Sequence, residues 1–196
     1  MTEKKRIAVF DFDGTITTKD TFVQFAFFSR GWLRTLFVFG CYCPLIILMK
    51  LRICDNGKVK QRIFSSLYKG MDINQFRQLG CDFSNRIDTF TNNDTLAKLY
   101  KHQRNGDIII VDTASINEWV LPWCEKHNIN KVIATEVEVI DNKLSGRFST
   151  PNCYGKEKLF RLSKELNDLS IYNITVYGDS RGDNEIMAIA DLKYWI

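Results

Sequence analysis

The feature that most constrains the fold is a short apolar run near the N-terminus that ends abruptly in carboxylates. Residues 7–10 (IAVF) have strand length, and residues 11–15 (DFDGT) follow directly. A continuous apolar run of this kind is typical of a strand that is buried on both faces. Successive side chains of a strand point to opposite faces, so those of Asp11 and Asp13 point to the same side. Gly14 lets the backbone approach a ligand closely. The sequence therefore predicts a buried strand with two carboxylates at its carboxyl end.

Further apolar segments predict the rest of a sheet. The expected strands cover 108–111, 132–134, 174–177 and, as a short fifth, 194–196. Helical periods of apolar residues stand on either side of the fourth strand, at Leu159, Leu162 and Leu166 before it and at Ile186, Ile189 and Ala190 after it. Strands that alternate with helices predict an α/β fold with a doubly wound parallel sheet. A period-two stretch over 136–148 predicts an additional β-hairpin.

The first two predicted strands are separated by about ninety residues, whereas a crossover needs only about a dozen. Phe22, Phe25 and Phe28 fall on one helical face, and Leu67, Phe76, Leu79 and Phe83 indicate further amphipathic helices with turns at Gly70 and Gly80. We therefore expect a small helical cap domain over 16–98, inserted into a core made of 1–15 and 99–196.

Composition excludes several classes of protein. With 45% apolar and 26% charged residues the chain is not disordered, and a net charge of +4 does not favour a nucleic-acid partner. Six scattered cysteines and two histidines, with no C-x-x-C pair, favour reduced thiols over a zinc site or a disulfide framework. Residues 2–6, four of which are charged, lead directly into the first strand, so we expect no signal peptide and a cytoplasmic location.

A second polar segment follows the strand over 108–111. It reads Asp112-Thr113-Ala114-Ser115, and Ser115 stands three residues before Glu118, which is the spacing of a capping box. We expect Ser115 to cap a helix. Thr113 and the backbone at Ala114 then lie where unpaired N–H groups and the helix dipole can hold a phosphate oxygen.

A third segment, residues 178–183 (GDSRGD), ends the fourth predicted strand with Asp179 and Asp183. Open α/β sheets bind ligands at this end of their strands, and carboxylates there favour Mg²⁺. Asp183 has a second interpretation as a helix-start residue that the dipole favours. Residues 155–158 (GKEK) begin the preceding helix and bring a lysine toward the same edge.

Together these segments resemble the four ordered motifs of the haloacid dehalogenase (HAD) superfamily. The motif residues are Asp11 to Thr15, Thr113, Lys158 and Gly178 to Asp183. An insert placed directly after the first motif, and the stretch 152–158, resemble the phosphoserine-phosphatase-like branch. The resemblance implies a Rossmann-like core, a phosphatase activity and Mg²⁺ as the cofactor.

The resemblance also implies roles for single residues. Asp11 would be the nucleophile that forms an aspartyl-phosphate, and Asp13 would be the general acid and base. Mg²⁺ would be bound by Asp11, Asp179 and the backbone carbonyl of Asp13. The transferring phosphoryl group would be held by Thr113, Lys158, Gly14 and Ala114, and Asp183 would orient the metal site or Lys158.

Two departures from the family pattern leave questions open. Asp112 stands where the family usually carries a less polar residue, and it could be a structural acceptor, a modifier of substrate choice or a source of repulsion toward phosphate. The phosphate lysine could be Lys156 or Lys158, and the family's glycine-x-x-lysine spacing favours Lys158. Asp20 corresponds to an acidic residue that meets the substrate's ammonium group in phosphoserine phosphatases, but it is an equally good helix N-cap.

Residues 36–49 are uncharged and are flanked by Arg30 and Arg34 before and by Lys50 and Arg52 after. As a helix this stretch would reach about 21 Å, which is too short for a hydrocarbon core of about 30 Å, and Pro44 would kink it. We favour a buried cap helix. The alternative is an interfacial segment that brings the protein to the inner face of a membrane, as would suit a lipid-headgroup phosphatase resembling bacterial phosphatidylglycerophosphatases.

The leading hypothesis is thus a Mg²⁺-dependent phosphatase that acts on a small, phosphoserine-like phosphomonoester. A lipid-headgroup substrate is the first alternative. A receiver-like phospho-acceptor domain and an inactive phosphate-binding module are alternatives of another class. Oligomeric state is left without a prediction.

Overall fold

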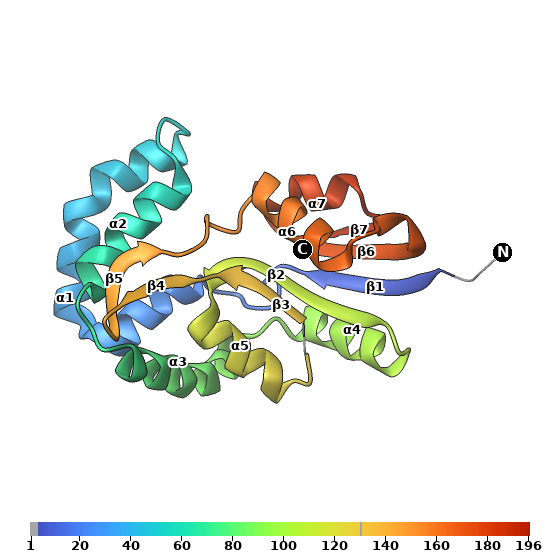
Figure 1. Cartoon of the computed structure of the whole chain (residues 1–196), viewed down its shortest axis with the longest axis horizontal. Helices are drawn as coiled ribbons and strands as arrows, with labels where there is room; N and C mark the ends of the chain where they lie inside the picture. The colour runs from blue at the N-terminus through green and yellow to red at the C-terminus, as the bar shows by residue number, and fades with distance from the viewer. Residues whose placement is uncertain (1–3, 130) are drawn as a thin grey trace.

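The computed structural model describes residues 4–129 and 131–196; residues 1–3, at the start of the predicted core, and residue 130 lie outside it. A five-stranded sheet forms the centre, in the order β3-β2-β1-β6-β7, and every neighbouring pair is parallel (Figure 1). Its strands are β1 (Lys5–Phe10), β2 (Ile108–Ile116), β3 (Lys131–Thr135), β6 (Tyr172–Gly178) and β7 (Leu192–Trp195). The predicted α/β class with a parallel sheet is confirmed.

Helices cover both faces of this sheet because the side chains of the central strand alternate between two apolar cores. Ala8 and Phe10 face the core that α5 (Asn117–Lys126) and α4 (Asn93–Arg104) share with the insert. Ile7 and Val9 face a second core with α6 (Lys156–Leu166) and α7 (Asn184–Ala188). Short 3-10 turns complete the chain at Asp88–Phe90, Leu169–Ile171 and Arg181–Asp183.

The insert contains the helices α1 (Thr21–Lys50), α2 (Asn56–Tyr68) and α3 (Ile73–Ile87), which gather at one end of the sheet (Figure 1). The predicted hairpin forms as β4 (Val137–Ile140) and β5 (Lys143–Phe148), and it reaches from the core to α2. Backbone bonds join it to the insert, from Gly70 N to Leu144 O and from Leu144 N to Met71 O. The boundary predicted after residue 98 falls inside α4, a continuous helix that packs on β2.

Helix α1 has two parts. Gly31, with φ 73° and ψ 173°, interrupts the helical backbone, and residues 32–50 form the second part. This left-handed φ favours glycine over any residue with a Cβ. The interruption lies at Gly31 and not at the expected position of Pro44, where helical backbone continues.

One predicted turn is wrong. Gly70 does form a turn between α2 and α3, but Gly80 lies inside α3. At Gly80 this helix touches α5 so closely that a Cβ would overlap the backbone oxygen of Glu118. The glycine is therefore explained by close packing of two helices, which its local sequence does not reveal.

Candidate active site

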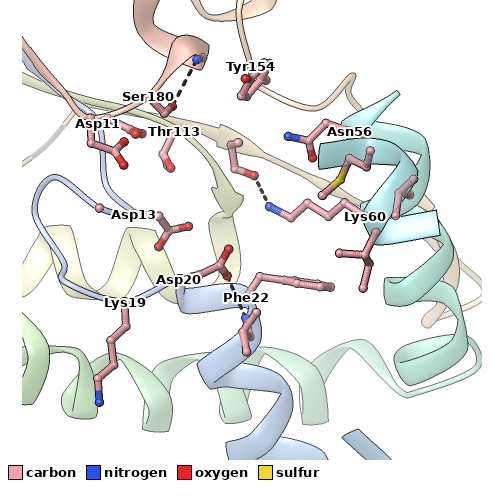
Figure 2. Close-up of a pocket in the computed structure, with 18 of the residues that line it drawn as sticks. Asp11, Asp13, Lys19, Asp20, Phe22, Asn56, Lys60, Thr113, Tyr154 and Ser180 are labelled. Atoms are coloured by element: carbon pink, nitrogen blue, oxygen red, sulfur yellow. Dashed lines mark hydrogen bonds between the residues drawn. The ribbon is translucent and has the colours of Figure 1, made fainter. Parts of the chain in front are cut away.

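The carboxyl ends of the central strands carry the polar side chains of the site. Asp11 follows β1, Asp179 follows β6, and Thr113 lies near the end of β2. Because these strands are parallel and adjacent, their carboxyl ends meet at one edge of the sheet. A pocket of about 560 Å³ opens there, and residues of α1 and α2 form its opposite wall (Figure 2).

Three carboxylates cluster at this end of the sheet, and two of them, Asp11 and Asp179, line the pocket. Oxygen atoms of Asp11, Asp179 and Asp183 all lie within 4.8 Å of one another. Gly14, with φ 80°, makes the cluster possible, since a Cβ at this position would overlap the carboxylate of Asp179. Carboxylate oxygens are the ligands that Mg²⁺ prefers, so this donor set fits a magnesium ion.

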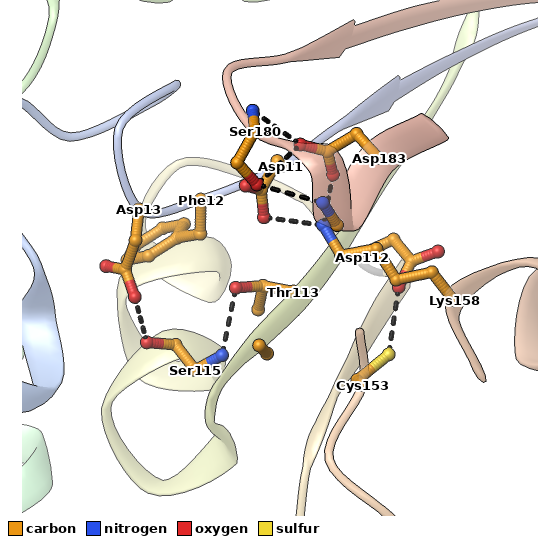
Figure 3. Close-up of polar contacts among 12 residues, drawn as sticks. Asp11, Phe12, Asp13, Asp112, Thr113, Ser115, Cys153, Lys158, Ser180 and Asp183 are labelled. Carbon is orange, nitrogen blue, oxygen red and sulfur yellow. Dashed lines mark hydrogen bonds and ion pairs between the residues drawn. The ribbon is translucent and has the colours of Figure 1, made fainter. Parts of the chain in front are cut away.

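Lys158 binds two of these carboxylates. Its Nζ donates to Asp11 Oδ1 at 2.7 Å and to Asp183 Oδ1 at 2.6 Å, and its side chain is 2% exposed (Figure 3). Burial lowers the pKa of Lys158, but the nearby Asp11, Asp183 and Asp112 outweigh this effect and hold the pKa above its usual range. The lysine therefore stays charged. Lys156, the other candidate, is exposed.

Asp183 is held in turn by the loop that precedes it. It is fully buried, and its Oδ2 accepts from Ser180 N at 3.1 Å and from Ser180 Oγ at 3.3 Å. Both carboxylate oxygens of Asp183 thus have partners, one from the loop and one from Lys158. The side chain is in the place where it can orient Lys158.

Asp13 points away from the carboxylate cluster and into a separate set of hydrogen bonds. Ser115 Oγ donates to its Oδ2 at 2.5 Å (Figure 3). Thr21 N donates to its Oδ1 at 2.9 Å. Ser115 Oγ lies 2.7 Å from Thr21 Oγ1, which accepts from Trp119 Nε1 at 3.0 Å. Burial raises the pKa of Asp13 to about 6, and these donors oppose the shift. The hydrogen bonds fix the direction of the carboxyl group.

The predicted capping role of Ser115 is wrong. Strand β2 continues to Ile116, α5 starts at Asn117, and none of the described side chains caps this helix. The pairing of β2 with β3 shifts register between Asp112 and Ile116, so Ser115 lies in an irregular part of the strand. Ser115 Oγ contacts Asp13, which is 102 residues away in the sequence, so the local spacing could not show this contact.

Thr113 and Ala114 both line the pocket beside Asp11. Thr113 Oγ1 accepts from Ser115 N at 3.0 Å, which leaves its own hydroxyl proton free for another acceptor. Ala114 O accepts from Thr135 Oγ1 at 2.9 Å and from Lys60 Nζ at 2.8 Å. The predicted phosphate-binding residues are thus brought to the same side of the pocket.

Lys60 is a site residue that the sequence analysis missed. It comes from α2, its Nζ lies 5.2 Å from the ring centroid of Phe22, and it faces Asp20 and Asp13 (Figure 2). Burial lowers its pKa, and the two aspartates oppose the shift. In the sequence it is one of several basic residues on an amphipathic helix, so nothing marks it out before the cap is folded.

Asp20 and Asp112 are the remaining predicted positions. Asp20 is the N-cap of α1, accepting from Val23 N at 2.9 Å, and it also lines the pocket. Asp112 is buried and accepts from Cys153 Sγ at 3.1 Å, while its other oxygen has no partner among the described residues. Burial raises the pKa of Asp112 to about 7. Three roles were left open for Asp112, and its contact with Cys153 fits the role of a structural acceptor.

Comparison with known proteins identifies the family. The sequence model of haloacid dehalogenase-like hydrolases matches residues 8–188, which include all of the motifs above. The chain belongs to this family. The HAD hydrolase assignment accounts for the order of the motifs along the chain and for the parallel sheet that carries them.

Individual proteins are similar to this HAD hydrolase in sequence or in fold. Protein CicA of Caulobacter vibrioides is 29% identical over 189 residues, which cover 95% of this chain and 84% of CicA. A solved protein of unknown function from Bordetella pertussis Tohama I superposes with a TM-score of 0.81 at 18% identity, covering 97% of this chain and 89% of that one. A phosphoserine phosphatase in complex with its substrate gives a TM-score of 0.67 at 18% identity, with 97% and 85% covered. The fold is thus shared with the phosphoserine-phosphatase-like branch.

Proposed function

We propose that this HAD hydrolase is a Mg²⁺-dependent phosphomonoester phosphatase that works through an aspartyl-phosphate on Asp11. The observation that carries the proposal is the position of Asp11, which is bound to the buried Lys158, lies among Asp179 and Asp183, and opens into the pocket. A carboxylate nucleophile of this kind splits phosphate transfer into two easier steps.

In the first step the Asp11 carboxylate attacks phosphorus and the bond from phosphorus to the substrate oxygen breaks. The leaving oxygen takes a proton from Asp13, whose carboxyl group is held by Ser115 and the backbone of Thr21. In the second step Asp13 removes a proton from water, and the resulting hydroxide attacks phosphorus. The bond to Asp11 breaks and inorganic phosphate leaves.

Charge decides whether this attack can occur. Two like charges about 4 Å apart repel by about 4 kcal/mol at an effective dielectric of about 20. Mg²⁺, held by Asp11, Asp179 and the backbone carbonyl of Asp13, would supply charge that neutralises the phosphate as it approaches. Lys158 adds a fixed positive charge, and Thr113 with the backbone at Gly14 and Ala114 binds the phosphoryl oxygens.

The substrate that we propose is a small phosphomonoester of the phosphoserine type, since Asp20 and Lys60 offer one negative and one positive group to the part of the substrate beyond the phosphate. One observation favours a lipid headgroup as the second candidate. Phe39, Ile46 and Met49 of α1 line the same pocket, so part of its wall is apolar.

The test is hydrolysis of p-nitrophenyl phosphate with Mg²⁺ by the full chain. We expect Asp11→Asn to remove activity, while Asp82→Asn, the same change at an exposed position on α3, retains it. A screen of phosphoserine, sugar and amino-alcohol phosphates, and detergent-dispersed phosphatidylglycerophosphate then identifies the substrate class.

Other outcomes would replace the proposal. A stable phosphoprotein that releases no phosphate would indicate a receiver-like domain. Retained Mg²⁺ binding without hydrolysis of any phosphomonoester would indicate a phosphate-binding module. Full activity in Asp11→Asn would contradict the assignment of the nucleophile.

A further inference from the structure

The second part of α1 exposes a large apolar surface. Its exposed side chains recur at the spacing of one helical face, and two residues of the following turn extend it. This outer face consists of Trp32, Leu33, Leu36, Phe37, Ile47, Leu51 and Ile53, of which Leu33 is 89% and Phe37 72% exposed. Scattered exposed apolar residues are common, but a continuous apolar patch marks an interaction surface. The preference for a buried cap helix over 36–49 is therefore wrong, because Val38 is the only residue of this range that is buried.

The opposite face of this helix belongs to the protein core. Thr35 is fully buried and Val38 is 7% exposed. Thr35 Oγ1 also donates to Ala26 O at 2.9 Å, which ties the second part of α1 back to the first across Gly31. The outer face thus belongs to a helix whose inner face already packs against the core.

Within the segment that carries the outer face, between Asp20 and Asp55, the charges along the chain have one sign. From Thr21 to Cys54 the chain carries four basic residues and no acidic one. Arg34, Lys50 and Arg52 are exposed at the two ends of the second part of α1. A patch that is apolar in the middle and basic at its ends complements a bilayer surface with anionic headgroups.

Helix α1 is long and apolar enough to cross a membrane by length and composition, and only 11% of its most apolar window is buried. A spanning arrangement conflicts with the fold, however. The first part of α1 carries Phe25 and Ala26, which are fully buried, and Thr21 N donates to Asp13. The second part alone would reach about 28 Å and contains Arg34 near its start.

We propose that the outer face of α1 docks this protein onto an anionic lipid bilayer, with the helix lying along the membrane surface. Phe39, Met49 and Lys50 of the same helix line the pocket. Docking through the outer face therefore leaves the pocket on the other side of α1, about one helix diameter, about 10 Å, from the membrane surface. The docking is independent of the proposed phosphatase activity, although together they would give the enzyme access to phosphate esters at the membrane.

The test is co-sedimentation of the full chain with vesicles made of equal parts of phosphatidylglycerol and phosphatidylcholine. We expect the wild type to bind, and binding to fall about tenfold or more in Leu33→Asp/Phe37→Asp because two exposed apolar groups become charged. Phe160→Asp makes the same change at a 63% exposed position on α6 and should bind like the wild type. Arg34→Gln, added salt and pure phosphatidylcholine vesicles should each weaken binding.

Thermal melting of each variant shows whether it is folded, so that loss of vesicle binding is not mistaken for unfolding. This control does not depend on enzyme activity. Equal vesicle binding by the double variant and by Phe160→Asp would overturn the proposal. Absence of wild-type binding to the anionic vesicles would also overturn it. A wild-type dimer in solution that Leu33→Asp/Phe37→Asp converts to monomer would show that a second copy covers the face instead.

Discussion

At the scale of single residues, the site depends on buried charges that compensate one another. Lys158 is held between Asp11 and Asp183, and all three side chains are nearly or fully buried. Removing one member of such a group leaves an uncompensated charge in a poorly solvated place. This lowers the free energy of unfolding far more than the loss of an exposed ion pair does.

We expect Lys158→Met to lower kcat/KM for p-nitrophenyl phosphate by about a hundredfold or more, because a positive charge at the transferring group is lost. Lys156→Met makes the same change at an exposed position two residues away. Steady-state kinetics should show near wild-type values for Lys156→Met. A larger loss at Lys156 than at Lys158 would refute the assignment of the phosphate lysine.

Asp13 depends on a hydroxyl that is remote in sequence. Ser115→Ala removes the donor to Asp13 Oδ2, so we expect kcat to fall about tenfold for alkyl phosphates. The loss should be smaller for p-nitrophenyl phosphate, whose leaving group needs little protonation. Ser170→Ala, at an exposed serine, is the matched control. Equal losses on both substrates would argue that Ser115 does not act through the general acid.

At the scale of helices and strands, close contacts between elements decide which substitutions the fold accepts. Helix α3 packs on α5 through Gly80, while Gly40 of α1 has open space around it. Both glycines lie inside helices, where alanine has the higher intrinsic propensity by about 1 kcal/mol.

The two glycines should therefore respond to the same substitution in opposite directions. Gly40→Ala should leave the thermal midpoint unchanged or raise it by a few degrees. Gly80→Ala should lower it, since the new Cβ meets the backbone of Glu118 and α3 must move away from α5. Thermal unfolding followed by circular dichroism measures both, and a stabilised Gly80→Ala variant would show that this contact is loose.

At the scale of the whole molecule, the clustered carboxylates that the proposed activity requires lower the stability of the fold. The sheet edge that forms the site gathers Asp11, Asp179 and Asp183 within 4.8 Å, and their mutual repulsion opposes folding. A cation that binds only the folded chain offsets this repulsion and shifts the unfolding equilibrium.

Mg²⁺ at about ten times its dissociation constant should stabilise the wild type by about 1.4 kcal/mol, or about 4 °C in thermal midpoint. Asp179→Asn should raise the midpoint without metal, because a repelling charge is removed, and should abolish the increment from Mg²⁺. Asp82→Asn should retain that increment. Differential scanning calorimetry with and without chelator measures the effect, and an unchanged increment in Asp179→Asn would place the ion elsewhere.

Most of the core was predictable because local patterns and tertiary structure agree there. The strands over 7–10, 108–111, 132–134 and 174–177 each lie within an observed strand, since buried parallel strands need continuous apolar runs. The positions of Asp11 and Asp179 at strand ends follow from the same runs. Ser115 and Lys60 were not predictable as site residues, because each reaches the site through a partner distant in sequence.

The sequence by itself determined the parallel sheet, the helical insert and the residue types at the carboxyl ends of the strands. These features follow from the spacing of apolar residues and from which residues are neighbours along the chain. Only the tertiary structure decided that Lys158 rather than Lys156 meets Asp11, that Gly80 is a contact and not a turn, and that half of α1 stays uncovered. These depend on which surfaces meet across the fold. A one-dimensional pattern shows that a residue is apolar or charged, and only packing shows what it faces.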